Sequence, residues 1–390
     1  MKRFSAQYII TNSGPLLKRS VITTEDDGTI INIENKQGDL NEGHSTEFYN
    51  GIIIPGFVNC HCHLELSHMK GSVPKGLGLG SFIEHVINSR DDKKEISSSA
   101  SSADKYMFKE GIVLCADICN TTDTFNLKKE SGIAYLNLLE AFGQDPDIAV
   151  RRMDEINTLA EKAKSMDLAF SLVPHAVYSM SLTLLKLLKS KSSANKVTSI
   201  HFMETKGEEV FLKQNSGPLM PPYSRSESVP PGIETGKYHV DIILNEITRS
   251  GNLILVHNTF ADQNTIREVS QRKNLFWCIC PNSNIYIENK IPPLNLLLDE
   301  GVEIVIGTDS LASNMSLSIL EELKTIQFNF PLIRIEDLIL WSTMNGAKAL
   351  CEENRFGSIE RGKKPGLLVL QNVDLQNMKL LPESFVTRLI

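Results

Sequence analysis

The stretch PGFVNCHCHLELSH, residues 55–68, decides the fold assignment because it ends an apolar run with two closely spaced histidines. Side chains of a β-strand alternate between its two faces, so His61 and His63 point one way and Cys60 and Cys62 the other. The pair to consider as metal ligands is therefore His61 with His63. An isolated H-x-H pair is more often a hydrogen-bonded core pair, so the rest of the chain has to decide between the two interpretations.

Apolar runs of strand length recur along the chain and alternate with amphipathic stretches that are typical of helices. The runs are nearly continuous, as in strands that are covered on both faces. Eight such units over about 260 residues predict a (β/α)8 TIM barrel, an α/β fold, with a doubly wound open sheet as the alternative. The expected strands are 52–63, 111–119, 132–140, 168–177, 196–205, 252–258, 275–281 and 302–310.

Polar residues at the ends of these runs separate the two folds. His175, His201, His257 and Asp309 each follow or end an apolar run, as His61 and His63 do. In a closed barrel the carboxyl ends of all strands converge on one mouth, whereas in an open sheet they spread along an edge. A single site built from these side chains therefore favours the barrel.

The two ends of the chain have a different pattern from the middle. Residues 1–50 and 356–390 show short alternating runs that are broken by Gly, Asp and Asn, which suits a small antiparallel β-sheet. Because domain termini usually lie close together, the two ends are expected to meet. We predict a discontinuous β-sandwich domain, made of residues 1–53 and 351–390, beside a barrel of residues 54–350.

Three segments outside these elements deserve a prediction. The loops 71–81 and 215–236 follow the first and fifth expected strands, so both should lie at the mouth of the barrel, where long loops often act as lids. The Ser-rich stretch EISSSASSADK, residues 95–105, is expected to be a solvated loop that leads into a helix.

Composition limits the partners. The chain has 390 residues and a net charge of −7, so a basic footprint for nucleic acid is missing. No apolar run approaches the roughly 18 residues that span a membrane, and the first residues lack the apolar core of a signal peptide. Seven cysteines, an odd number, suggest reduced thiols. A cytoplasmic protein with a small-molecule substrate is expected.

Several imidazoles and one carboxylate form a donor set that suits Zn²⁺, and also Fe²⁺ or Mn²⁺. A bound metal of this kind lowers the pKa of its water toward about 7. Hydrolysis then needs a group that moves protons, and Glu204, three residues after His201, is the candidate.

The motifs PGFVNCHCHLELS, HFMET, VHN, CPNSN and GTDS, in this order, resemble the amidohydrolase superfamily. The likeness extends to GSIERGKKPGLLVL near the C-terminus and is strongest to the branch of cytosine, guanine and adenosine-type deaminases and triazine chlorohydrolases. It implies one divalent metal, with zinc expected and iron or manganese as alternatives, and a homodimer is common in the family. The implied metal ligands are His61, His63, His201 and Asp309.

The same resemblance implies the catalytic roles. Glu204 would shuttle protons, His257 would orient the attacking water and stabilise the tetrahedral intermediate, and Asp309 would help to activate the water. Members with two metals use a bridging lysine or glutamate near the third or fourth strand. No lysine lies near His175, which favours one metal, although Glu140 at the end of the third strand leaves two open.

The stretches HCHLELSHMKG, PHAVYSMS and HFMETKGEEVFLKQNSGPL are similar to those of aminodeoxyfutalosine deaminase-like proteins. The implied reaction hydrolyses the exocyclic amine of an amino-heterocycle, such as a purine nucleoside derivative, and releases ammonia. A chlorohydrolase or cyclic-amide hydrolase on the same metal site is the alternative, and a non-catalytic amidohydrolase-like binding protein is another. The implied substrate contacts are Glu65, Ser67, His175 and Tyr178.

Overall fold

The computed structural model describes residues 1–39, 45–89, 93–214, 216–220 and 238–390. Each of the eight predicted apolar runs contains a strand, and these strands form two parallel four-stranded sheets. The first sheet has the order β6 (Phe57–Cys62), β7 (Ile112–Cys119), β8 (Ala134–Ala141) and β9 (Phe170–Pro174). The second has the order β10 (Val197–Phe202), β11 (Asn252–His257), β12 (Leu275–Ile279) and β13 (Glu303–Ile306).

The two sheets touch each other at both of their outer strands. Isolated parallel bridges pair Ala176 with His201, just beyond β9, and Cys62 with Asp309, just beyond β13. The amide of His201 donates to the carbonyl of His175 at 2.8 Å, and the amide of Asp309 donates to the carbonyl of His61 at 3.0 Å. Both joins lie at the carboxyl ends of the strands, where the polar residues were expected to gather.

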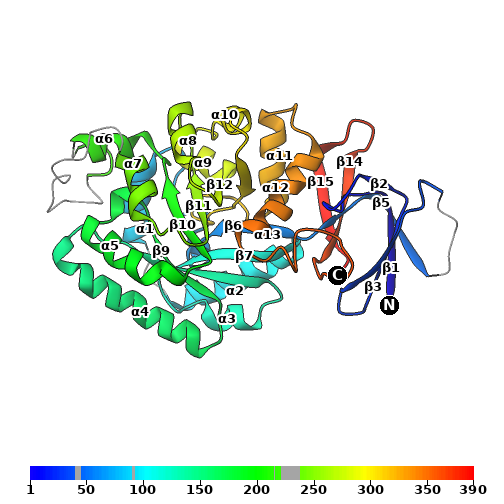
Figure 1. Cartoon of the computed structure of the whole chain (residues 1–390), viewed down its shortest axis with the longest axis horizontal. Helices are drawn as coiled ribbons and strands as arrows, with labels where there is room; N and C mark the ends of the chain where they lie inside the picture. Colours follow the sequence, from blue (N-terminus) through cyan, green and yellow to red (C-terminus); the bar gives the residue numbers. More distant parts are fainter. Residues whose placement is uncertain (40–44, 90–92, 215, 221–237) are drawn as a thin grey trace.

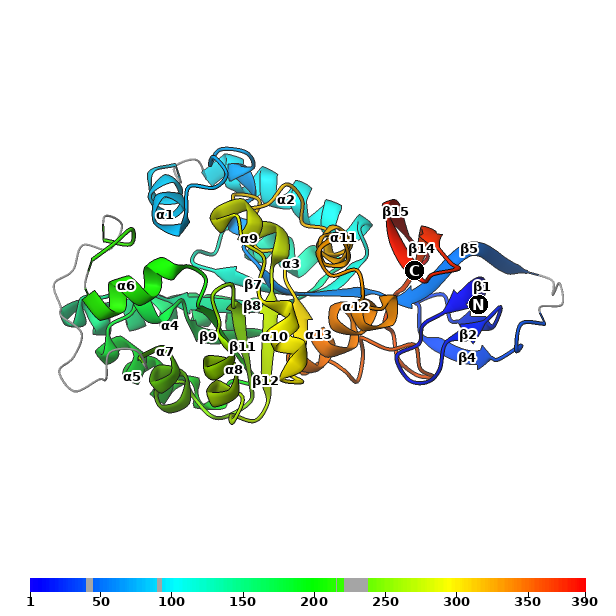
Figure 2. The ribbon, with the colours of Figure 1, turned by 90° about the horizontal axis from the view of Figure 1, so that it is seen from above.

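Helices follow the strands in alternation and lie around them (Figures 1 and 2). In α4, for example, Met153, Ile156 and Ala163 are buried against the strands, and these positions recur at helical spacing. The helices are α1 (Leu79–Asn88), α2 (Lys93–Lys109), α3 (Phe125–Glu130), α4 (Ala149–Ser165), α5 (Leu182–Lys191), α6 (Lys206–Gln214), α7 (Tyr238–Asp241), α8 (Gln263–Val269), α9 (Pro281–Glu288), α10 (Leu294–Asp299), α11 (Ile319–Asn329), α12 (Ile335–Ser342) and α13 (Met344–Ala349).

The Ser-rich stretch 95–105 is part of helix α2, so its prediction as a loop was wrong. Ala100, Ala103 and Met107 are buried along one face, which gives the helix a packing surface. Serine hydroxyls turn back onto the helix, since Ser102 Oγ donates to the carbonyl of Ser98. Burial of small apolar residues therefore outweighs the weak helix propensity of serine.

Strands from both ends of the chain form a seven-stranded sheet in the order β15-β14-β5-β1-β3-β4, with β2 paired to β1. Both chain termini lie in this part of the molecule, at the right of Figure 1. The second layer of the expected sandwich and the domain boundaries stay predictions. The strands are β1 (Lys2–Ile9), β2 (Leu17–Lys18), β3 (Val21–Thr24), β4 (Ile30–Glu34), β5 (Thr46–Pro55), β14 (Leu367–Asp374) and β15 (Lys379–Arg388).

Strand β5 connects the two parts of the molecule. Ile53 packs on one face of the terminal sheet with Phe4 and Ile22, whereas Ile52 and Ile54 belong to the large core. This alternation follows from strand geometry, in which neighbouring side chains point to opposite faces. The chain then enters β6 at Phe57, so the terminal sheet and the first strand of the site are nearly continuous.

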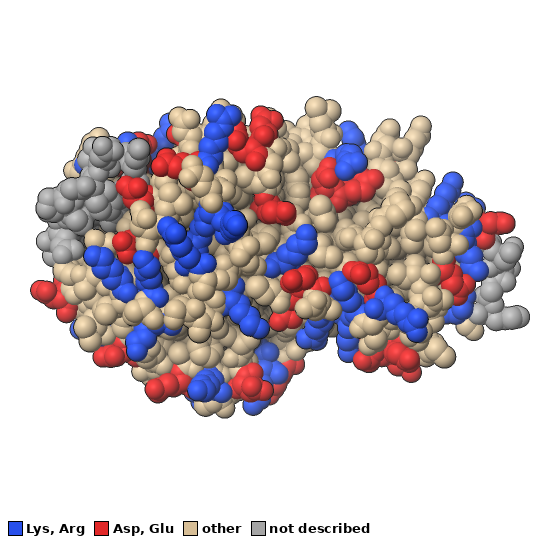
Figure 3. Space-filling model, in the orientation of Figure 1, with Lys and Arg blue, Asp and Glu red and all other residues tan. Residues whose placement is uncertain are grey.

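The described helices include none with the length and apolar character that a membrane-spanning helix needs. On the face displayed in Figure 3, the basic and acidic side chains of the described residues are interspersed, so opposite charges offset one another locally. Of the two expected lid loops, 71–81 leads into α1. In the other, residues 216–220 are described, and 215 and 221–236 lie outside the described residues.

Candidate metal and catalytic site

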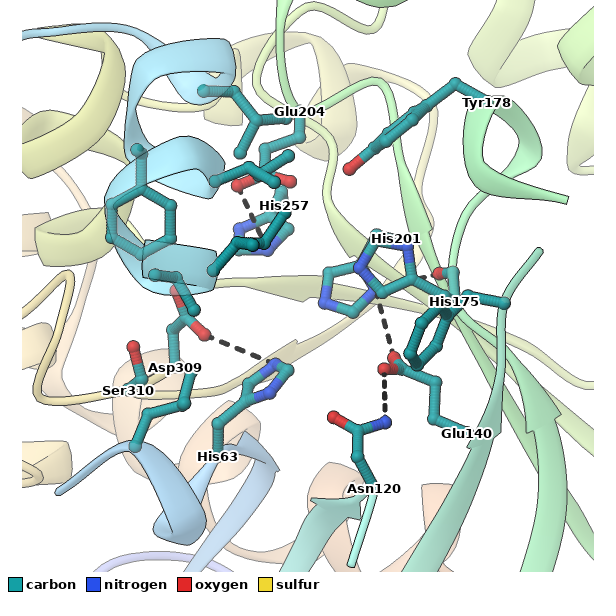
Figure 4. A pocket seen from close by; sticks show the side chains of 17 residues that line it. His63, Asn120, Glu140, His175, Tyr178, His201, Glu204, His257, Asp309 and Ser310 are labelled. Carbon is teal, nitrogen blue, oxygen red and sulfur yellow. Dashed lines mark hydrogen bonds and ion pairs between the residues drawn. The ribbon is translucent and has the colours of Figure 1, made fainter. Parts of the chain in front are cut away.

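The polar residues expected at the strand ends meet at one open cavity of about 200 Å³. Figure 4 shows that they reach it from different strands and point toward a common centre. Five histidine rings stand close together, with the centroids of neighbouring rings 4.6–5.5 Å apart. Six of the polar residues expected at the strand ends line the cavity: His63, His175, His201, Glu204, His257 and Asp309.

His61, His63 and Asp309 have the spacing of ligands to one ion. The Nε2 atoms of the two histidines are 3.1 Å apart, and Asp309 Oδ1 lies 3.6 Å from His61 Nε2 and 3.5 Å from His63 Nε2. Ligands at tetrahedral Zn–N and Zn–O distances are separated by about 3.3 Å. His201 and His257 offer nitrogens to the same region beside His61. The donor set therefore fits a divalent metal.

The protonation of the histidines also suits a metal. Burial lowers the pKa of His63 and of His201 well below the usual value, so both rings are neutral near pH 7. His201 Nδ1 lies 2.8 Å from the carbonyl oxygen of His175, to which it donates. This bond leaves the Nε2 lone pair of His201 for a ligand, the arrangement that metal-binding histidines commonly have.

Asp309 is held by two serines. Ser283 Oγ and Ser313 Oγ each donate to Asp309 Oδ2 at 2.6 Å, which leaves Oδ1 facing His61 and His63. Burial opposes the charge of this carboxylate, but its hydrogen bond with His61 and the nearby imidazoles outweigh burial and lower its pKa. Asp309 is therefore ionised and oriented, as a metal ligand must be.

The pKa of Glu204 is shifted in the direction opposite to that of Asp309. Burial, followed by the charge of Asp309, raises the pKa of Glu204 well above its usual value. Its backbone is fixed by Glu208, whose Oε1 accepts from the amide of Glu204 at 2.6 Å and from the amide of Thr205 at 3.2 Å. Two carboxyl groups in one cavity thus differ in proton affinity, which is the usual mark of acid–base roles.

His257 faces Glu204 across the cavity. Its Nε2 lies 3.6 Å from Glu204 Oε1, and its Nδ1 lies 3.1 Å from the side-chain amide nitrogen of Asn284. With that amide donating to Nδ1, the ring carries its proton on Nε2, directed into the cavity. Burial lowers the pKa of His257 to about 3, so the ring is a neutral donor.

The backbone at these strand ends adopts conformations that side chains rarely take. His257 has φ of 77°, Asp309 has φ of 57°, and Met203, next to Glu204, has φ of 48°. Such left-handed residues cost about 1–3 kcal/mol each and cluster at functional sites. The turns direct the side chains into the cavity where a regular strand would continue past it.

Two of the four expected substrate contacts, His175 and Tyr178, line the cavity. Glu65 is buried and accepts hydrogen bonds from the amide and hydroxyl of Thr121, both at 3.0 Å. Ser67 lines a separate hollow with Tyr106 and Leu317. Glu65 and Ser67 are absent from the described residues that line this cavity, so their role as substrate contacts stays a prediction.

Glu140 lies at the edge of the site rather than between its central donors. Its Oε1 is 3.8 Å from His201 Nδ1, and its Oε2 accepts from the side-chain amide of Asn120 at 3.0 Å. Glu140, His175 and His201 form a second group with the spacing of metal ligands. Because His201 Nδ1 already donates to a backbone carbonyl, the first group is the better metal site.

Sequence reasoning missed the side chains that contact Asp309 and His257, and it missed the apolar wall of the cavity. Ser283 and Asn284 belong to the CPNSN motif, which carried no assigned role, and Ser313 follows the GTDS motif. The sequence signal that could have identified these three residues is their position within or just after the two motifs. The apolar wall comes from α1, whose sequence looks like that of any amphipathic helix and so gave no sign of a role in the site. The residues of this wall are Leu79, Phe82, Ile83, Val86 and Ile87.

Comparisons with known proteins agree with this site. Residues 52–387 match the model of the amidohydrolase family, and the chain belongs to that family. An adenosine deaminase from Helicobacter pylori is 29% identical over 83% of this chain and 79% of its own length. A 5-methylthioadenosine/S-adenosylhomocysteine deaminase from Pyrococcus abyssi is 25% identical over 85% of this chain and 76% of its own length.

Solved structures extend the comparison to the fold. The aminofutalosine deaminase of H. pylori, in complex with methylthio-coformycin, has a TM-score of 0.76 at 25% identity, covering 95% of this chain and 92% of its own. An adenosine deaminase from Xanthomonas campestris with bound zinc has a TM-score of 0.71 at 18% identity, covering 97% and 86%. The protein has the TIM-barrel type of fold of these neighbours.

The family assignment confirms the resemblance and the enzyme class expected from the sequence. The protein is a hydrolase that acts on carbon–nitrogen bonds, as its deaminase relatives are. Members of the family bind a divalent metal, and the histidine and aspartate groups described above could hold one.

Proposed function

We propose that the protein is a metal-dependent deaminase of 6-aminopurine nucleosides. The observation that carries this proposal is the convergence of His61, His63 and Asp309 at 3.1–3.6 Å, beside a buried carboxyl group that retains its proton, Glu204. Relatives named for adenosine and methylthioadenosine support a purine nucleoside as the substrate.

Zinc is the metal that we propose, held by His61, His63, His201 and Asp309. When bound, a metal of this kind lowers the pKa of its water and supplies a nucleophile near neutral pH. The neutral imidazoles and the ionised carboxylate are the protonation states that binding requires, so little proton release should accompany it.

Glu204 and His257 would carry out the proton chemistry. A bond forms between water oxygen and the purine carbon, the bond from that carbon to the exocyclic nitrogen breaks, and ammonia leaves. Glu204 transfers a proton to the ring nitrogen, takes one from the attacking water and passes it to the departing amine, and it regains the remaining hydroxyl proton as the carbonyl group of the product forms. The Nε2 proton of His257 would stabilise negative charge on the incoming oxygen.

The proposal extends to the fold and the surroundings of the site. We propose that the two parallel sheets make one closed eight-stranded barrel, which the contacts of β9 with β10 and of β13 with β6 support. Residues 54–350 would form this barrel, with 1–53 and 351–390 as a separate β-domain. The expected homodimer and cytoplasmic location stay predictions.

The test is the variant Glu204→Gln, assayed for ammonia release from adenosine and for bound zinc. Losing the proton carrier should lower kcat by about 10²–10⁴-fold while one zinc per chain is retained. Glu209→Gln is the matched control, because Glu209 is an exposed carboxylate on α6, the helix that follows Glu204, and it should keep full activity.

Two results would count against the proposal. Near-normal turnover in Glu204→Gln would remove its role as proton carrier. A zinc-loaded parent enzyme that releases no ammonia from aminopurine nucleosides, but releases chloride from chlorotriazines or opens cyclic amides, would favour the alternative hydrolases.

A further inference from the structure

Helix α1 forms an apolar wall along the catalytic cavity. Leu79, Phe82, Ile83, Val86 and Ile87 line it, and their spacing places them on one face of the helix. Leu79 is 4% exposed and Ile87 is 60% exposed, so the wall runs from the depth of the cavity to its mouth. A nucleoside with its amine at the metal ligands would direct its far end along this wall.

The N-terminus of α1 has no cap of its own. Gly78 precedes the helix and has no side chain to accept from the first amides. The acceptor comes from α9 instead, where Glu288 Oε1 accepts from the amide of Leu79 at 2.9 Å. A carboxylate at this position satisfies a free amide and interacts favourably with the helix dipole.

Further hydrogen bonds fasten the loop before α1 to the same helix. Tyr286 Oη donates to the carbonyl of Val73 at 2.6 Å, and the carbonyl of Tyr286 accepts from the amide of Gly76 at 2.7 Å. The amide of Gly78 donates to the carbonyl of Ile287 at 3.0 Å. The last turn of α9 therefore determines where α1 begins.

The first turn of α9 holds two catalytic-site residues. Ser283 donates to Asp309, and Asn284 contacts His257, as described above. Figure 2 shows α1 and α9 on the same side of the strands. One short helix thus sets the distance between the apolar wall and the groups that act on the amine.

The opposite side of α1 leaves little room for the helix to move. A Cβ atom built on Gly80 would lie 2.1 Å from the carbonyl oxygen of Pro218, so only glycine allows this approach. The helix is held between the segment 216–220 and α9, and the bond to Glu288 is the one charged contact among those just described.

We propose that Glu288 is a positioning residue for substrate selectivity, which rests on the proposed function. By capping α1 it holds the apolar wall against the cavity, and the wall favours purine nucleosides that carry an apolar substituent at the 5′ position. Glu288 itself need not touch the substrate, and its effect should appear in the KM of substituted nucleosides.

The experiment compares adenosine with its 5′-methylthio derivative, using the zinc-loaded full-length enzyme. Glu288→Ala removes the cap and should raise KM for the methylthio derivative about fivefold, with a smaller rise for adenosine, so that discrimination between them falls. Glu288→Gln keeps an oxygen acceptor for Leu79 and should retain most of the discrimination. Glu268→Ala is the control, because Glu268 is a half-buried carboxylate on α8 that does not line the cavity.

The outcomes separate this inference from the proposed function. If the parent enzyme deaminates neither nucleoside, the proposed function fails. If it deaminates both and Glu288→Ala leaves the ratio of KM values unchanged, the positioning role is overturned. A fall in kcat for both nucleosides in both Glu288 variants would show that the carboxylate acts through its charge on Glu204, and would also overturn it.

Discussion

Two buried polar clusters lie beside each other where the paired strands β6 and β7 place Cys62 next to Asp117, and they are built on opposite principles. In one cluster, Lys128 Nζ donates to three acceptors: Asp117 Oδ2 at 2.5 Å, and Cys119 Sγ and Asn137 Oδ1 at 3.0 Å each. In the other, nitrogens and a carboxylate oxygen of the candidate metal site face one another across 3.1–3.6 Å.

The difference shows which cluster serves stability and which serves chemistry. Burial opposes the charge of Lys128, but Asp117 and Cys119 together outweigh burial and raise the pKa of the ammonium group, so the ion pair persists. Asp117 also accepts from the amide of Leu64 at 2.7 Å, directly after His63. The lysine cluster is thus complete in itself, whereas the histidine cluster directs lone pairs at a space that a cation would fill.

The largest effect is expected from breaking the complete cluster. Lys128→Met leaves the buried Asp117 without its cationic partner, which should lower the free energy of unfolding by about 3–5 kcal/mol. Denaturant unfolding followed by circular dichroism measures the change. Lys129→Met, on the exposed side of the same helix, is the control and should have almost no effect. A loss below 1 kcal/mol in Lys128→Met would contradict the ion-pair assignment.

Adding zinc should stabilise the protein through the histidine cluster and not through the lysine cluster. Zinc at about 100 times its Kd should raise the free energy of unfolding of chelator-treated protein by about 2.7 kcal/mol. In Asp309→Asn, which removes the charged ligand, this increment should shrink, whereas Lys129→Met should keep it. An equal increment in all three proteins would mean that zinc binds elsewhere.

A smaller effect should follow from crowding the histidine cluster. A Cβ atom on Gly307 would lie 2.8 Å from His61 Cβ and 2.9 Å from Cys280 Sγ, so Gly307→Ala forces His61 to shift. We expect a loss of about 1–3 kcal/mol in stability and weaker zinc binding, measured by unfolding and by competition with a chelating dye. Gly14→Ala, which meets no atom within 4 Å, is the control and should leave zinc affinity unchanged.

The smallest effect, taken over one pH unit, concerns a buried carboxyl group that accepts two hydrogen bonds and has no cationic partner among the contacts described here. Glu322 accepts from the amide of Asn282 and the side chain of Asn314, yet burial raises its pKa to about 8. Because the folded state then holds a proton that the unfolded state releases, stability should fall as pH rises from about 4.5 to 8. The contribution is at most about 1.4 kcal/mol per pH unit within that window.

Glu322→Gln should flatten this part of the pH dependence, measured on metal-free protein so that the histidine cluster contributes equally to both curves. Glu321→Gln, an exposed neighbour paired with Lys324, should leave the slope as it is in the parent. A parent protein whose stability rises between pH 5 and 8 by the same amount as the variant would show that Glu322 is ionised in the folded state.

Much of the fold could be predicted because its pattern is local. Each apolar run became a strand, since a strand covered on both faces needs little beyond continuous apolar residues. The Ser-rich helix α2 was missed because its stability comes from Ala100 and Met107 packing on distant residues. The pairing of β1 with β5, which is parallel in an otherwise largely antiparallel sheet, also depends on contacts that the pattern does not contain.

For the candidate site, the candidate metal ligands could be predicted from the sequence, whereas the residues that position them and line the cavity could not. His61, His63 and His201 stand at strand ends that alternation and motif spacing identify. Glu208, Ser313 and the wall of α1 gain their significance only from contacts with residues that are distant in sequence or turned by the local backbone. Ordinary residue types in ordinary contexts give no signal before the chain is folded.

By itself, the sequence determined which residues can donate to a metal and which segments become strands, because donor chemistry and apolar periodicity are properties of the residues. Only the tertiary structure decided that a helix 200 residues away caps the wall of the cavity, and that one buried carboxyl group is ionised while its neighbour is protonated. Hydrogen bonds and burial act through space, so they distinguish Asp309 from Glu204 only when the strand ends have come together.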